Sequence, residues 1–109
     1  MTKNVSIKIQ VVTGVRKDVH ISFSPSTAYA QPGDNIEWRS RWPFTVHFPY
    51  GTPAGRASLY AEDSGADYWI VSSLVSARAR GRYRYSAGVN VGGKIQVGHS
   101  DSIIIEDPW

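Results

Sequence analysis

The chain has 109 residues, 41% of them hydrophobic and 12% aromatic, which is enough for one domain with a modest core. This composition excludes a disordered chain, and no apolar run is long enough to span a membrane. Cysteine is absent, which excludes disulfides, thiolate metal sites and cysteine nucleophiles. The net charge of +3 is only mildly basic and does not by itself indicate an anionic partner.

The N-terminal segment has no apolar stretch of the kind found in signal peptides. We therefore expect the protein in the cytoplasm if the chain is complete, and in the periplasm or outside the cell if a signal peptide was removed. The sequence shows no repeat, linker or low-complexity tract. Residues 1–109 are predicted to form a single domain.

Strict alternation of apolar and polar residues predicts two strands at the start of the chain, over residues 4–12 and 19–23. Successive side chains of a strand point to opposite faces, so one face of each strand is expected to be buried. His20 falls on the outward face of the second strand. The residues expected to be buried are Val5, Ile7, Ile9, Ile21 and Phe23.

A Pro-Gly-Asp turn at residues 32–34 precedes the next predicted strand. Proline presets φ, glycine accepts a positive φ and aspartate bonds to nearby backbone, so the three residues favour a tight turn. Ile36 and Trp38 then point to the buried side of the strand. A second apolar run, over residues 44–48, contains His47.

Residues 50–67 are rich in glycine, proline, alanine and acidic residues, which predicts a long loop with one helical turn near residues 57–60. The strands predicted after this loop cover residues 68–71, 74–75, 82–89, 94–97 and 103–105. Gly92-Gly93 predicts a two-residue hairpin turn. The residues expected to be buried in these strands are Tyr83, Tyr85 and Ile95.

Seven to nine short strands with almost no helix predict an all-β fold, a sandwich of two sheets. The order of motifs resembles the cupredoxin-like family: a Pro-Gly-Asp turn, then Trp38, His47 and a Gly-x-Tyr-x-Tyr strand at residues 81–85. The resemblance covers roughly residues 19–97 and implies a two-sheet Greek-key β-sandwich. An immunoglobulin-like sandwich is the alternative, because it can show the same motifs.

Blue-copper members of that family bind the metal through a histidine, a cysteine, a second histidine and usually a methionine. His47 matches the first ligand, whereas the cysteine position falls near Ala87, and residues 88–98 contain neither histidine nor methionine. The resemblance therefore implies the fold without the electron-transfer site, as in small bacterial cupredoxin-like domains of unassigned role. A structural or surface histidine is the alternative to a residual metal ligand at position 47.

Between residues 68 and 100 the chain has four arginines and one lysine but no acidic residue. Arg82 and Arg84 are expected side by side on an outward face, because residues i and i+2 of a strand share a face. Guanidinium groups suit phosphate or carboxylate ligands. The alternative is a solvated face whose charge is balanced by the acidic residues at 62, 63 and 67.

Trp42 lies in a predicted loop beside Arg39 and Arg41. Exposed aromatic residues next to arginine are typical of interaction hot spots. A tryptophan that closes one end of the core is the alternative, and the sequence leaves both roles open. The candidate binding residues are thus Arg39, Arg41, Trp42, His47, Arg82 and Arg84.

The sequence contains no recognisable catalytic motif, since the carboxylates lack paired spacing and no serine lies in a Gly-x-Ser-x-Gly pattern. We therefore expect a non-enzymatic, metal-free, cupredoxin-like binding module that needs no cofactor and binds another protein or itself. One alternative is a copper-binding protein that uses His47. The other is an anion or carbohydrate binder that uses Arg82, Arg84 and the Trp42 loop.

Neither a membrane nor a nucleic acid is an expected partner. No apolar run is long enough to enter a membrane. Binding to single-stranded nucleic acid needs aromatic side chains on the same face as the cations. Tyr83 and Tyr85 are predicted on the face opposite Arg82 and Arg84.

Overall fold

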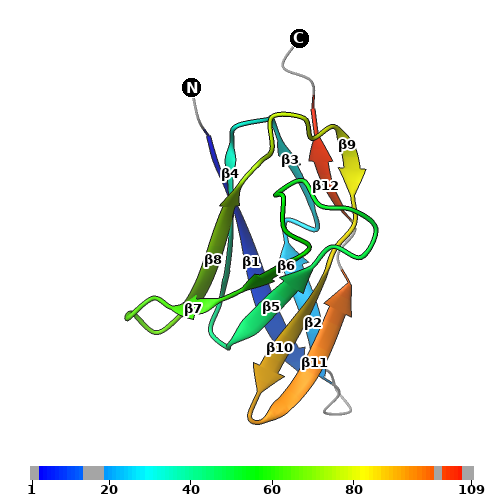
Figure 1. Cartoon of the computed structure of the whole chain (residues 1–109). Helices are drawn as coiled ribbons and strands as arrows, with labels where there is room; N and C mark the ends of the chain where they lie inside the picture. Colours follow the sequence, from blue (N-terminus) through cyan, green and yellow to red (C-terminus); the bar gives the residue numbers. More distant parts are fainter. Residues whose placement is uncertain (1–2, 14–18, 100–101, 107–109) are drawn as a thin grey trace.

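The computed structural model of the protein describes residues 3–13, 19–99 and 102–106. These residues form twelve β-strands (Figure 1), and no helix long and apolar enough to cross a membrane occurs among them. The strands are β1 (Asn4–Thr13), β2 (Val19–Ser24), β3 (Thr27–Ala30), β4 (Asn35–Ser40), β5 (Phe44–His47), β6 (Ser58–Tyr60), β7 (Glu62–Asp63), β8 (Trp69–Leu74), β9 (Gly81–Tyr83), β10 (Ser86–Val91), β11 (Lys94–His99) and β12 (Ser102–Ile105).

The strands form three sheets that are stacked as the two layers of a β-sandwich (Figure 1). One layer is a five-stranded sheet with the order β2-β1-β4-β8-β7. The other layer consists of a four-stranded sheet, β11-β10-β5-β6, and a three-stranded sheet, β3-β12-β9. Pairing is antiparallel except between β1 and β4 and between β3 and β12. The predicted all-β sandwich is confirmed.

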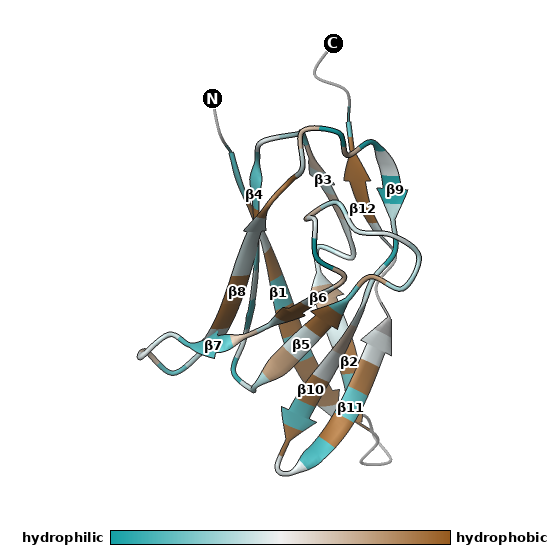
Figure 2. Cartoon of the chain, viewed as in Figure 1, coloured by the Kyte–Doolittle hydropathy of each residue, from teal (hydrophilic) through white to brown (hydrophobic). Residues whose placement is uncertain are grey.

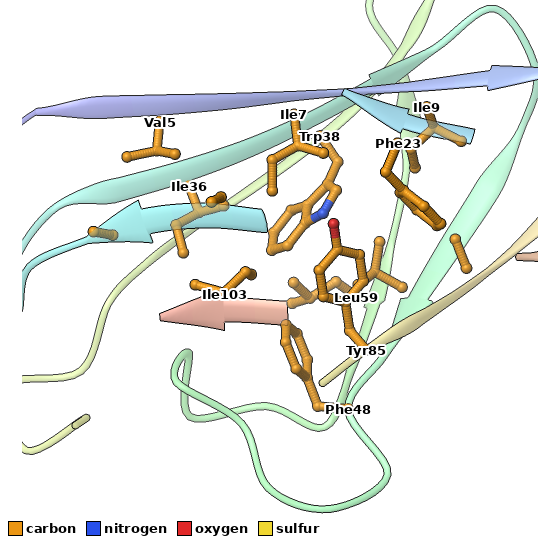
Figure 3. Packing of buried hydrophobic residues seen from close by; sticks show 14 of the residues in the cluster. Val5, Ile7, Ile9, Phe23, Ile36, Trp38, Phe48, Leu59, Tyr85 and Ile103 are labelled. Atoms are coloured by element: carbon orange, nitrogen blue, oxygen red, sulfur yellow. The ribbon is translucent and has the colours of Figure 1, made fainter. Parts of the chain in front are cut away.

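Trp38 on β4 lies at the centre of the core between the two layers (Figure 3). Its side chain is 0% exposed, and its ring packs edge-on against Tyr85 and Phe48 at centroid distances of 5.8 and 6.1 Å. Phe23 also packs edge-on against Tyr85, at 5.3 Å. Such edge-to-face pairs stabilise a core beyond the area that they bury.

The predicted buried faces agree with the structure except in the last long hairpin. The predicted residues that are buried are Val5, Ile7, Ile9, Phe23, Ile36, Trp38 and Tyr85. Ile21 and Tyr83 are half-buried at the edge of the core. His20 is exposed, as predicted. These outcomes follow from the period-2 pattern of strands that have one face in the core.

Ile95 was predicted to be buried, and this prediction is wrong, because the residue is 64% exposed. It lies on the edge strand β11, where Gln96 pairs with the buried Val89 and Gly98 with the buried Ala87. This register turns Ile95 and its neighbour Val97 to the outer face. Figure 2 shows the resulting apolar bands along β11.

The helical turn predicted near residues 57–60 is also wrong. Residues 58–60 form β6, which pairs antiparallel with β5, and residues 62–63 form β7, which pairs with β8. The two strands predicted at residues 68–71 and 74–75 are one continuous strand, β8. Long-range pairing rather than local composition therefore determines the structure of this segment.

The long strand predicted over residues 82–89 is broken into β9 and β10. β9 pairs with β12 in the three-stranded sheet, whereas β10 pairs with β5 and β11 in the four-stranded sheet. The chain passes from one sheet to the other at Arg84 and Tyr85. The hairpin turn at Gly92-Gly93 between β10 and β11 is confirmed, with φ values of 59° and 90°.

The turn before β4 is confirmed, and it is fixed by a buried carboxylate. Gly33 has a φ of 90°, which favours glycine. The carboxylate of Asp34 accepts the backbone N–H groups of Lys3 at 3.1 Å and Gln31 at 2.9 Å. Asp34 therefore ties the beginning of the chain to the turn that starts β4.

Candidate functional site

An open depression of about 740 Å³ lies where the β4–β5 loop meets the β7–β8 hairpin. We call it the aromatic depression. The side chains that line it are Arg41, Trp42, Asp63, Asp67, Tyr68 and Trp69. It combines three aromatic rings, one guanidinium group and two carboxylates within 29 residues of sequence, drawn from the β4–β5 loop and the β7–β8 hairpin.

The β4–β5 loop contributes Arg41 and Trp42. Ser40 is buried at the end of β4, and its hydroxyl oxygen accepts the backbone N–H of Trp42 at 3.3 Å. The Trp42 side chain is 39% exposed, so it is neither free in solvent nor part of the core. The sequence left two roles open for Trp42, an exposed interaction residue or a residue that closes one end of the core. Its exposure favours the first role.

The β7–β8 hairpin contributes the other four side chains, and its loop is held by its own hydrogen bonds. The backbone N–H and the hydroxyl of Ser64 both donate to the carbonyl oxygen of Tyr68, at 3.0 and 2.7 Å. Asp63 accepts the N–H of Gly65 at 2.9 Å. Asp67 has a φ of 57°, a left-handed conformation that aspartate and asparagine accept better than most residues. The loop therefore presents its carboxylates from a defined backbone.

Trp69 joins this hairpin to the core. It pairs with Asp63 on β7 and with Ser40 on β4, so it lies between the two loops that form the depression. Its side chain is half-buried and packs against the hydrophobic core. Trp69 thus forms a wall of the depression that is packed against the core, whereas the ring of Trp42 is more accessible to solvent.

Arg39 lies beside the depression and contacts Glu37 and Tyr68. Its Nε donates to Glu37 Oε2 at 2.7 Å, and its guanidinium lies 5.0 Å from the centroid of the Tyr68 ring. The hydrogen bond and the charge of Glu37 raise the pKa of Arg39, which stays protonated. Arg39 is therefore held by Glu37 and packs against the ring of Tyr68.

Arg41 and Asp67 differ from Arg39 in this respect. Within residues 3–13, 19–99 and 102–106, neither side chain makes a hydrogen bond or an ion pair. Asp63 uses one carboxylate oxygen for the N–H of Gly65 and keeps further acceptor capacity. The depression therefore has one guanidinium group and two carboxylates with hydrogen-bonding capacity for a ligand.

His47 lies elsewhere, on the outer face of β5, and both of its ring nitrogens are engaged. Nδ1 is 2.9 Å from Ser58 Oγ, and Nε2 is 3.0 Å from Thr45 Oγ1. Ala87, at the position where the resemblance expects a cysteine, is fully buried and pairs with Val46. No group of three or more metal-ligating side chains is found in the part of the chain that the structure describes. These residues do not fit a blue-copper site.

Arg82 and Arg84 border a second, smaller hollow of about 350 Å³, together with Tyr50, Gly51 and Tyr83. Both arginines are exposed, and Tyr50 is 87% exposed. The two arginines border one hollow, although Arg84 lies beyond the end of β9 and not on one strand with Arg82, as was expected. This hollow has no lining residue in common with the aromatic depression.

The six predicted site residues thus fall into three places. Arg39, Arg41 and Trp42 lie in or beside the aromatic depression, Arg82 and Arg84 border the second hollow, and His47 lies on a sheet face. Sequence reasoning missed Asp63, Asp67, Tyr68 and Trp69. The available signal was the Asp-Ser-Gly segment flanked by strand-forming residues, which is typical of a hairpin turn.

No family model matches the chain, and no curated protein is similar to it in sequence.

Proposed function

We propose that the protein is a non-enzymatic, metal-free binding module of the cupredoxin-like, Greek-key type, and that its ligand binds in the aromatic depression. The observation that supports this is the convergence of Trp42, Trp69 and Tyr68 with three charged groups in one open hollow. Binding sites are typically concave and aromatic, with a few polar groups that orient the ligand. Tryptophan and arginine also dominate interaction hot spots.

The metal-free part of the proposal is supported by the surroundings of His47. A metal at this histidine would have to displace Thr45 or Ser58 from a ring nitrogen. A blue site also needs a thiolate, which gives its intense visible absorption. The sequence has no cysteine to supply one. Titration of the protein with Cu(II) should therefore produce no strong blue band, and a strong band would contradict the proposal.

A thermal-shift screen tests whether the depression binds a ligand. A compound that binds the folded protein raises its melting temperature by mass action. We expect at least one class among neutral oligosaccharides, small anions, small organic cations and short peptides to stabilise the wild type and Tyr50→Ala, but not Trp42→Ala. Tyr50 is a matched control, because it is an exposed aromatic residue of the other hollow. Equal stabilisation of Trp42→Ala by every active compound would contradict the proposal.

A second candidate function is anion binding at the hollow of Arg82 and Arg84. The observation that favours it is that both guanidinium groups border one hollow beside the exposed ring of Tyr50. Paired guanidinium groups suit phosphate or carboxylate. This surface would serve an acidic partner or a second copy of the protein.

A further inference from the structure

We propose that the ligand of the aromatic depression is a neutral oligosaccharide, with one sugar ring stacked on Trp42 and its hydroxyls bound by Arg41, Asp63 and Asp67. This inference rests on the proposed function, because it names the ligand class of the same site. Three features of the depression lead to it: the accessible aromatic ring, the mixed charges and the open shape.

The accessible ring is that of Trp42. An aromatic face carries negative electrostatic potential, and the C–H groups on the flat side of a pyranose carry partial positive charge, so the two surfaces attract and exclude water together. Trp42 is 39% exposed, which leaves part of its ring open to such a partner. Trp69 is packed against the core and can act as the wall beside it.

The mixed charges argue against an ionic ligand. A cation would meet the guanidinium of Arg41, and an anion would meet the carboxylates of Asp63 and Asp67. A cage for a quaternary ammonium group needs free aromatic faces. One face of Tyr68 is already covered by the Arg39 guanidinium at 5.0 Å.

A neutral polyol satisfies both kinds of group at once. A hydroxyl donates one proton and accepts through its lone pairs, whereas a carboxylate only accepts and a guanidinium only donates. Adjacent sugar hydroxyls can therefore donate to Asp63 and Asp67 and accept from Arg41. The hydrogen bonds of Ser64 and Gly65 hold the hairpin that carries both carboxylates, which lowers the ordering cost of binding.

The shape of the depression favours a chain over a single sugar. Its volume of about 740 Å³ lies in the range of sites that hold drug-sized ligands. It is open rather than enclosed, so it does not close around the end of a ligand. An oligosaccharide can lie across it with sugars continuing on both sides.

Calorimetric titration with defined probes tests the inference. The neutral probes are the pentasaccharides of cellulose, xylan, mannan and chitin, and the ionic probes are tetramethylammonium and sulfate. We expect at least one neutral pentasaccharide to bind, with an affinity that changes less than about twofold between low and high salt, because no net charge is screened. Neither ionic probe should bind in the depression.

Single substitutions in the depression test which side chains contact the sugar. Trp42→Ala should weaken sugar binding at least about tenfold, whereas Trp42→Tyr should stay within about threefold of the wild type, because it keeps an aromatic face. Asp67→Asn should weaken binding about three- to tenfold, because it removes the negative charge that accepts the sugar hydroxyl. The loss should be no larger, since asparagine keeps an oxygen acceptor and accepts the positive φ of this position. Tyr50→Ala, the control in the other hollow, should bind as the wild type does.

The inference and the proposed function can fail separately. In one outcome, tetramethylammonium or sulfate binds to the wild type and binds more weakly to Trp42→Ala, whereas none of the four sugars binds. The depression would then be a binding site, but not for a carbohydrate. Sugar binding that is unchanged in Trp42→Ala would overturn the stacking contact and therefore the inference. If no probe binds and the thermal-shift screen finds no Trp42-dependent ligand, both are wrong.

Discussion

Trp38 is fully buried at the centre of the core and contacts Phe48, which follows β5, and Tyr85, which lies between β9 and β10. Removing a buried aromatic side chain loses its transfer free energy and leaves a cavity. We expect Trp38→Ala to lower the free energy of unfolding by roughly 3–5 kcal/mol in urea denaturation. Trp42→Ala is the control and should cost about 1 kcal/mol or less, because Trp42 is partly exposed. Similar losses for the two variants would contradict this description of the core.

Asp34 is a second residue with a defined role, because its carboxylate accepts two backbone N–H groups from separate parts of the chain. Hydrogen bonds to a charged group contribute roughly 1.5–3 kcal/mol, and donors that lose a partner in a buried place cost free energy. We expect Asp34→Ala to destabilise the fold by about 2–4 kcal/mol in the same denaturation experiment, taking the two bonds together. Asp34→Asn keeps one acceptor oxygen and should lose about half as much. An alanine variant as stable as the asparagine variant would show that the carboxylate does not hold the turn.

Among the elements, β11 approaches β2 closely at Gly98. A Cβ atom at this position would lie 2.6 Å from Ile21 Cγ2 on β2 and even closer to Ile21 Cβ, which is part of the branched base of the side chain. Such overpacking forces strands apart and costs about 1–3 kcal/mol. We expect Gly98→Ala to lower the free energy of unfolding by this amount.

Gly88 provides the matched control for Gly98. It lies on the neighbouring strand β10, and a Cβ atom there would meet Thr45 and Ile95 at the ordinary contact distances of 3.4 and 3.5 Å. Gly88→Ala should therefore change stability by less than about 1 kcal/mol. Equal effects at the two glycines would mean that β2 and β11 are not packed as described.

The strands that the sequence predicts best have one face in the core and a paired strand on each side in the sheet. β1 and β4 show a clear period of two, and their buried residues were predicted correctly. β6 has only three residues, and it is a strand because it pairs with β5. Ile95 was misplaced because β11 is an edge strand whose core-facing positions are Gln96 and Gly98, which do not look like core residues in a sequence.

The candidate site was predicted in part for a related reason. Arg41 and Trp42 stand out locally, because a tryptophan and an arginine adjoin in a proline-containing loop. Asp63, Asp67 and Trp69 join them only through the pairing of β7 with β8 and of β8 with β4. That pairing is a long-range property of the fold, and alternation within one strand does not reveal it.

In the whole molecule, residues 68–100 stand out because they contain five basic residues and no acidic one. Within the described residues, the guanidinium of Arg80 bonds to the carbonyl oxygens of Ala77 and Ala79, whereas Arg82 and Arg84 make no ion pair. The latter two border the second hollow. This is the arrangement expected if they contact an acidic partner or a second copy of the protein.

The double variant Arg82→Ala/Arg84→Ala tests that role. Each substitution should change stability by no more than about 0.5 kcal/mol, because both side chains are exposed. If the surface is a contact, the pair should weaken association by roughly 1 kcal/mol or more, as hot-spot arginines do. Analytical ultracentrifugation and capture of an acidic partner measure this, with the exposed Arg78→Ala as the control. Identical behaviour of the double variant and the wild type would identify a merely solvated face.

Ligand binding in the aromatic depression can be followed residue by residue in a nuclear magnetic resonance titration that monitors the indole N–H signals. Trp42 and Trp69 line the aromatic depression, whereas Trp38 is buried in the core. On addition of the neutral pentasaccharide that binds in calorimetry, we predict that the Trp42 and Trp69 signals move together and the Trp38 signal stays in place. Movement confined to the backbone amides of Arg82 and Arg84, with both depression indoles unchanged, would contradict the account and place binding at the other hollow.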